Sequence, residues 1–95
     1  MTTVSTHVLD TAAGRPAEGV RVELWNDVDL VGDGATDADG RIGRLAEVEP
    51  GTYRIRFFPM TPFFRQVELE IVLGDGHYHV PLLVSPYGCA SYRGS

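Results

Sequence analysis

The sequence contains no lysine, and its eight basic residues are all arginine. Schiff-base chemistry and the lysine of phosphate-binding loops are therefore excluded. Thirteen acidic residues outnumber these arginines and give a formal net charge of −5. Because a protein of this sign repels phosphate backbones and anionic lipid, we expect neither nucleic acid nor a membrane surface as a partner.

Cysteine is almost absent, since Cys89 is the only one. A single thiol excludes an intrachain disulfide and any zinc or iron–sulfur site built from several cysteines, and it suits a reducing compartment. The apolar runs are only a few residues long, and Met1 is followed directly by polar residues. We therefore expect no transmembrane span, no signal or transit peptide, and a cytoplasmic location.

The hydrophobic pattern has a period of two residues rather than the 3.6 of a helix. Apolar and polar residues alternate over 20–24, 53–57 and 67–73, and 77–84 is a further candidate strand. Turn-forming residues separate these stretches, and no helical pattern of 10 to 15 residues lies between them. The sequence therefore predicts an all-β sandwich that forms one domain over 1–95, a size at which oligomerisation is a common source of added stability.

Two turns have further interpretations. Gly74-Asp75-Gly76 predicts a hairpin between the stretches 67–73 and 77–84. Asp37-Ala38-Asp39-Gly40 lies in an acidic loop, but aligning Gly40 with the glycine of a calcium loop places Ala35 and Ala46 at the first and last ligand positions. A simple turn is the better interpretation.

Three histidines are the candidates for chemistry: His7, His77 and His79. His77 and His79 share one face if they lie on a strand. With His7 they could ligate zinc, one of them could be a general base, or all could be structural, and spacing alone leaves these options open. The segment 91–95 follows the apolar run 80–84 without linker composition, so we expect it to stay on the protein body. No serine lies in a Gly-x-Ser-x-Gly motif.

Motifs along nearly the whole chain resemble the transthyretin-like family, and within it the 5-hydroxyisourate hydrolases. The opening Ser5-Thr6-His7-Val8-Leu9-Asp10 and the segment Thr36-Asp37-Ala38-Asp39-Gly40-Arg41-Ile42 are similar to two landmarks of that family. The closing motifs are the most specific: His77-Tyr78-His79-Val80-Pro81-Leu82-Leu83, then Ser85-Pro86-Tyr87-Gly88, then Tyr92-Arg93-Gly94-Ser95.

The resemblance implies a transthyretin-like sandwich of two antiparallel sheets, in a homotetramer built as a dimer of dimers with active sites between the dimers. It implies hydrolytic opening of the 5-hydroxyisourate ring, in urate degradation, to 2-oxo-4-hydroxy-4-carboxy-5-ureidoimidazoline, without a metal or an organic cofactor. The residues that it assigns to catalysis are His7, Arg41, His79 and Ser95. Those that it assigns to substrate binding are His7, Arg41, Tyr92, Arg93 and Gly94.

The chain departs from the family pattern at three places. The region 58–65 is compressed, so we expect the family's short helix to be reduced or absent. Cys89 stands where the family commonly has tyrosine, and the loop 25–35 is short and acidic. Because the implied pocket lies between subunits, such changes leave two alternatives open: an enzyme repurposed for another heterocycle, or a non-catalytic carrier of a small molecule.

Overall fold

The computed structural model describes residues 1–95 as nine strands without a helix. The strands are β1 (Thr2–Asp10), β2 (Arg15–Pro16), β3 (Arg21–Trp25), β4 (Leu30–Ala35), β5 (Arg41–Val48), β6 (Gly51–Phe58), β7 (Val67–Leu73), β8 (Gly76–Val84) and β9 (Cys89–Ser91). The expected all-β class and the expected absence of the short helix are both confirmed. No helix that could cross a membrane is present.

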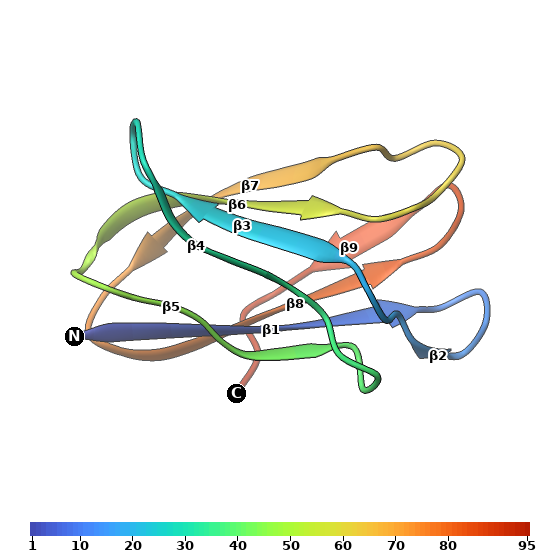
Figure 1. Cartoon of the computed structure of the whole chain (residues 1–95), viewed down its shortest axis with the longest axis horizontal. Helices are drawn as coiled ribbons and strands as arrows, with labels where there is room; N and C mark the ends of the chain where they lie inside the picture. Colours follow the sequence, from blue (N-terminus) through green and yellow to red (C-terminus); the bar gives the residue numbers. More distant parts are fainter.

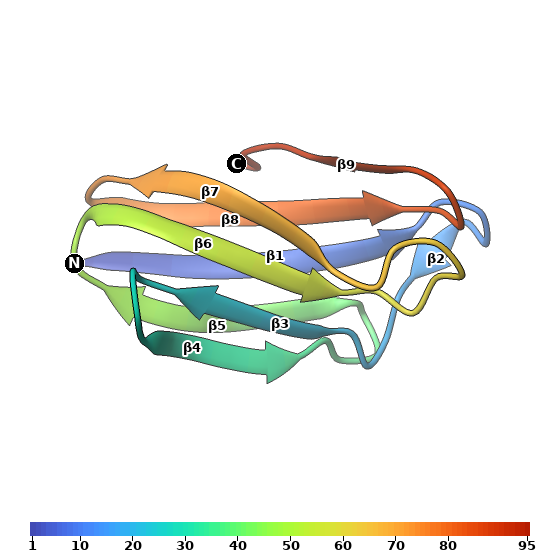
Figure 2. The same cartoon turned by 90° about the horizontal axis from the view of Figure 1, so that it is seen from above.

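The strands form two facing sheets, which Figures 1 and 2 show as two layers. One sheet has five strands in the order β2-β1-β8-β9, with β5 also paired to β1. The other has four strands in the order β4-β3-β6-β7. This is the predicted two-sheet sandwich, and its edge strands β7 and β9 lie on the same side of it (Figure 2).

The core fills the space between the sheets because alternate side chains of each strand point inward. Fully buried members include Val4 and Val8 on β1, Leu82 on β8, and Ile55 and Phe57 on β6. The intervening residues of β1 and β8 must then point away from the core. The outer face of the five-stranded sheet is therefore where polar side chains of these two strands gather.

β1 and β8 run parallel, which differs from the expectation of two purely antiparallel sheets. The predicted hairpin at Gly74-Asp75-Gly76 is also wrong, because this turn carries the chain from β7 in one sheet to β8 in the other. Glycine does provide the positive φ there, +106° at Gly76. A turn signal specifies that the chain reverses, whereas the partner of the next strand depends on which pairing buries the apolar faces.

The C-terminal segment lies against the protein body, as expected. β9 pairs antiparallel with β8, and the chain then returns along β8 as far as an isolated bridge between Gly94 and His79. The Gly94 amide donates a 2.7 Å hydrogen bond to the His79 carbonyl. The last residues are therefore held beside the histidine-bearing part of β8.

We predict that the core depends strongly on Phe57, which is fully buried, and weakly on Phe63, which is 67% exposed. Phe57→Ala should lower the free energy of unfolding by about 3–5 kcal/mol, because it removes buried apolar area and leaves a cavity. Phe63→Ala is the matched control and should stay within about 0.5 kcal/mol of the parent. Urea denaturation measures both, and equal losses in the two variants would contradict this description of the core.

Candidate active site

Three strands bring the candidate residues together on the outer face of the five-stranded sheet. Residues 3, 5 and 7 of β1 point outward, since residues 4 and 8 are buried in the core. The parallel register places His79 of β8 beside Ser5, and the antiparallel register with β5 places Arg41 opposite His7. Residues more than seventy positions apart in the sequence thereby become neighbours.

These residues surround a polar hollow of about 290 Å³. Its lining comes from four segments and consists of Ser5, Thr6, Arg41, Ile42, Gly43, His77, His79 and Ser95. The ring of His7 lies at its side, with 6.4 Å between the ring centroids of His7 and His79. The structure thus brings together the four residues predicted for catalysis, His7, Arg41, His79 and Ser95.

His79 is held from two sides. Its Nδ1 shares a 2.7 Å hydrogen bond with the Ser5 hydroxyl. Gly94 lies so close that a Cβ there would come within 2.6 Å of the His79 Cδ2 atom, so only glycine fits. The ring nitrogen next to Cδ2, Nε2, has no hydrogen-bond partner in the chain and is the atom available to a ligand.

The surroundings of His79 lower its pKa below the ordinary histidine value. Burial is the largest cause, and the positive charges of His7, Arg41 and His77 add to it. Both effects disfavour the imidazolium form. His79 is therefore a neutral base near pH 7, with a free nitrogen at the hollow.

His7 is oriented by the turn 37–40. Its Nε2 lies 2.9 Å from the Asp39 carbonyl oxygen, and since a carbonyl only accepts, this nitrogen carries the proton. The Asp37 carboxylate accepts hydrogen bonds from the amides of Asp39 and Arg41, and Gly40 has a φ of +74°. The interpretation of this segment as a turn is confirmed, and the turn fixes both His7 and the start of β5.

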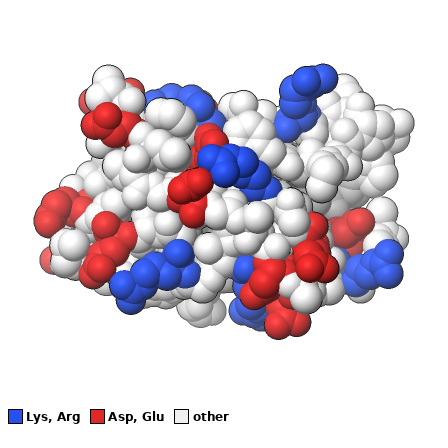
Figure 3. Space-filling model, in the orientation of Figure 1, with Lys and Arg blue, Asp and Glu red and all other residues white.

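Arg41 is an exposed cation that forms no ion pair within the chain. Four other arginines are paired, among them Arg21 with Glu23 and Asp33 and Arg56 with Glu68, whereas Arg15, Arg65 and Arg93 form no ion pair either. Figure 3 shows such mixing of acidic and basic side chains over one face of the molecule. The free guanidinium of Arg41 at a polar hollow suits an anionic or carbonyl-rich ligand.

The structure does not bring the side chains of Tyr92 and Arg93 into this hollow. The Arg93 guanidinium lies 4.1 Å from the ring centroid of Tyr78, and Tyr92 is 56% exposed. Both line a separate, largely apolar cleft of about 400 Å³ between β7 and the tail. Within this chain their contacts anchor the tail, whereas Gly94 and Ser95 lie against the hollow.

The three histidines do not form a metal site in this chain. No group of three or more histidine, cysteine, aspartate or glutamate side chains is placed to hold a metal ion. His77 and His79 each share a hydrogen bond with the Ser5 hydroxyl instead. The pairing of β1 with β8 thereby engages both ring nitrogens of His77 and leaves the Nε2 of His79 free.

Sequence reasoning missed Ser5 and Thr3 as members of this cluster and left His77 without a role. The pattern that could have found them is the alternation of faces along a strand. Residues 3, 5 and 7 share one face of β1, and residues 77 and 79 share one face of β8. That signal has meaning only when the two strands are known to be neighbours. The sequence does not show this pairing.

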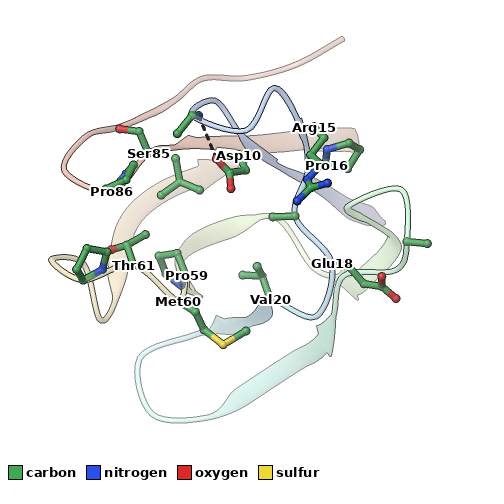
Figure 4. Close-up of a pocket in the computed structure, with 15 residues that line it drawn as sticks. Asp10, Arg15, Pro16, Glu18, Val20, Pro59, Met60, Thr61, Ser85 and Pro86 are labelled. Carbon is green, nitrogen blue, oxygen red and sulfur yellow. Dashed lines mark hydrogen bonds between the residues drawn. The ribbon is translucent and has the colours of Figure 1, made fainter.

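A larger cleft of about 590 Å³ lies elsewhere, between the loops around 10–18, 59–62 and 84–86 (Figure 4). It contains no histidine, and its Asp10 carboxylate is occupied by hydrogen bonds from the amides of Ala12 and Ala13. The largest cleft is therefore not the one that contains the candidate residues. The smaller hollow combines a neutral base, a free cation and a docked tail.

Comparison with known proteins gives consistent results. The model of the HIUase/Transthyretin family matches residues 4–94. The 5-hydroxyisourate hydrolase 2 of Rhizobium meliloti is 41% identical, covering 97% of this chain and 95% of that protein. The structure of Klebsiella pneumoniae 5-hydroxyisourate hydrolase superposes with a TM-score of 0.91 at 34% identity over 100% of both chains.

Transthyretin itself has the same fold. The structure of sea bream transthyretin in complex with thyroxine superposes with a TM-score of 0.88 at 25% identity, covering 96% of this chain and 93% of that one. The alignment with the Rhizobium protein runs over 117 residues, more than the 95 of this chain, so the relative carries residues that are missing here. Sequence and fold agree that the chain belongs to the HIUase/Transthyretin family.

Proposed function

We propose that this chain is a 5-hydroxyisourate hydrolase that opens the ring of its substrate at a cyclic amide during urate degradation. The observation that carries this conclusion is that Arg41, His79 and Ser95 line one hollow, with the ring of His7 beside that of His79. The names of the relatives point to the same reaction. A base, a cation and hydrogen-bond donors are the groups that amide hydrolysis requires.

His79 is the residue best placed to activate water. It is neutral near pH 7 because burial and neighbouring charges lower its pKa, and its Nε2 is free. General-base catalysis by such a group contributes about 10² to 10⁴ in rate. His7 already donates through Nε2 to the Asp39 carbonyl, so we assign it to holding the substrate beside His79.

Arg41 supplies fixed positive charge. Its guanidinium cannot act as a base, but it can bind the ring carbonyls or an anionic form of the substrate with two donors at once. Its charge also disfavours protonation of His79. Charge that develops on the carbonyl oxygen during attack is stabilised by the same group.

The tail completes one wall of the site. Gly94 fits against the His79 ring, and Ser95 lines the hollow, where its hydroxyl can donate to a substrate carbonyl. The direct binding of substrate by Tyr92 and Arg93 stays a prediction, because their side chains lie in the neighbouring cleft. The stacking of Arg93 on Tyr78 supports an additional role for Arg93 in keeping Gly94 in place.

We further propose that each chain contributes one domain to a homotetramer, arranged as a dimer of dimers with this hollow between dimers. The hollow is open on a single chain, so a second copy would exclude water from it. The edge strands β7 and β9 lie on one side with exposed Val72 and Tyr92 beside them, as expected of an interface. A cytoplasmic location stays a prediction from the sequence.

The reaction is tested by following the loss of absorbance of freshly made 5-hydroxyisourate. We expect wild-type turnover, and a fall of about 10² to 10⁴ in kcat for His79→Ala, which removes the base.

Arg41→Lys should not restore the activity lost in Arg41→Ala, since an ammonium cannot reproduce the planar pair of donors. Ligand binding without turnover would favour a carrier, and turnover of another heterocycle that depends on the same residues would favour a repurposed enzyme.

The pH dependence follows from the direction of the His79 shift. Because its pKa lies below the ordinary value, kcat/KM should remain high on lowering the pH through 6.5 and fall only at more acidic pH. Arg41→Gln removes one cause of the shift and should raise the pKa of His79, as measured by NMR titration of its ring protons. Arg44→Gln, whose arginine pairs with Glu47, is the matched control and should leave this pKa unchanged.

The position of the tail is tested by adding one methyl group. In Gly94→Ala the new Cβ would collide with the His79 ring, so the tail must move and kcat/KM should fall by about 10-fold or more, as for a misplaced catalytic group. In Gly34→Ala the nearest atom to the new Cβ is the Ile42 Cδ1 at 3.5 Å, an ordinary contact, and activity should be retained. Full activity in Gly94→Ala would show that the tail is not part of the site.

A further inference from the structure

An unbroken series of hydrogen bonds leads from His79 to the surface of the sheet. The His79 Nδ1 and the Ser5 hydroxyl lie 2.7 Å apart, and the same hydroxyl lies 2.9 Å from the His77 Nε2. The His77 Nδ1 in turn lies 2.7 Å from the Thr3 hydroxyl. Ser5 and His77 line the hollow together with His79, whereas Thr3 lies outside its lining and is half-buried, so the series leads along the wall of the hollow to its edge.

The number of hydrogens on these groups limits the directions that the hydrogen bonds of the series can take. A serine hydroxyl has one hydrogen, so Ser5 donates to one imidazole and accepts from the other. A neutral imidazole likewise has one N–H and one bare nitrogen. With all three groups neutral, the hydrogen bonds must point the same way along the series, either from His79 toward Thr3 or from Thr3 toward His79.

The direction decides what His79 can do. When the bonds point toward Thr3, His79 carries its proton on Nδ1 and presents a bare Nε2 to the hollow, which is the form of a base. When they point toward His79, Ser5 donates to Nδ1 and the proton of His79 is on Nε2, which is the form of an acid. The tautomer of His79 is therefore set by Ser5, and the state of Ser5 is set by His77.

The proposed reaction moves protons in two steps. Water loses one proton as it adds to the amide carbonyl, and the nitrogen takes one proton as the carbon–nitrogen bond breaks. The new carboxylic acid, with an ordinary pKa near 4, is ionised at pH 7 and loses its own proton as the product leaves. Between the two steps His79 must therefore hold the proton of the water or pass one on.

We propose that Ser5, His77 and Thr3 form a proton relay that sets His79 as the base, exports one proton when His79 activates water, and returns one when His79 protonates the leaving nitrogen. The proposal rests on the proposed function. As His79 takes a proton on Nε2, its Nδ1 proton passes to Ser5, the Ser5 proton to His77, the His77 proton to Thr3, and a Thr3 proton to water, so His79 reaches its acid form. As Nε2 then gives its proton to the nitrogen of the breaking bond, the same transfers run in reverse and restore the base form.

The charged groups around the relay are few. On β5, Glu47 lies opposite Thr3, where it can receive a released proton through water. On the tail, the Arg93 side chain reaches the His77 carbonyl rather than its ring, at 3.5 Å. The N-terminal amine is paired with Asp75. His7 and Arg41 lie at the other end, beside His79. Because Arg44 is paired with Glu47, the positive charge near His79 is what favours proton movement outward.

The relay is tested with variants that separate orientation from proton transfer. Ser5→Ala should lower kcat by about 10- to 100-fold, the range found when a hydrogen-bond partner that orients a histidine is lost, with KM little changed. Ser5→Thr keeps the hydroxyl and should restore most of kcat. His77→Gln can still accept from Ser5 but cannot pass a proton on, so it should lower kcat and reduce the number of protons detected in a solvent-isotope proton inventory.

The tautomer of His79 gives a readout that needs no substrate. Nitrogen-15 NMR of the ring should find the proton of neutral His79 on Nδ1 in the wild type and in His77→Gln, and a shift toward Nε2 in Ser5→Ala. Ser85→Ala is the matched control, since this hydroxyl bonds to Gly88 far from the hollow, and it should change neither tautomer nor kcat.

The outcomes separate the two proposals. An active wild type whose Ser5→Ala variant keeps kcat and KM would overturn the relay while leaving the hydrolase intact, and so would Nε2 protonation in the wild type. A wild type without activity on 5-hydroxyisourate would contradict the proposed function, and the ring spectra would still decide whether Ser5 sets the tautomer. If His77→Gln keeps full kcat with an unchanged proton inventory, the transfer of protons through His77 is excluded.

Discussion

The parallel pairing of β1 with β8 is the constraint on which the rest of the structure depends. It buries Val4, Val8 and Leu82 on one side, and this burial fixes the register. Because a slip of one residue would exchange the two faces of a strand, the same register must place Ser5 beside His79 on the other side. The same register therefore determines both the core packing and the positions of Ser5, His77 and His79, while the turn 37–40 orients His7.

The remaining parts of the site attach to this pair. β5 joins the far edge of β1 and brings Arg41 to His7, and the tail after β9 returns along β8 to bring Gly94 to His79. Each attachment is a backbone ladder or bridge, so the functional groups stand on rigid elements. The short helix of the family is absent between β6 and β7, as expected from the compressed region 58–65, and this loop borders the larger cleft rather than the hollow, so these attachments stay in place. This explains how a chain shorter than its relatives keeps the polar set.

Much of this architecture could be predicted from the sequence. The period-two pattern predicts the strands, Asp and Gly predict the turn at 37–40, and the family motifs name Arg41, His79 and Ser95 of the hollow and His7 beside it. The pairing of β1 with β8 was not predictable, since a turn at Gly74-Asp75-Gly76 is equally compatible with a hairpin or with a crossing between sheets. For the same reason Ser5 was missed, because its importance arises from a neighbour more than seventy residues away. The side-chain positions of Tyr92 and Arg93 were also beyond reach, as they depend on where the tail meets Tyr78.

The most direct test of the account is to locate where the protein binds urate, a stable relative of the substrate, by the NMR signals of its three histidine rings and its backbone amides. The account predicts that urate shifts the ring signals of His7 and His79 and the amides of Gly43 and Gly94, and that it leaves the larger cleft around Pro59 and Pro86 unchanged. Shifts confined to that larger cleft, with the histidine rings unaffected, would contradict the claim that the outer face of the five-stranded sheet is the active site.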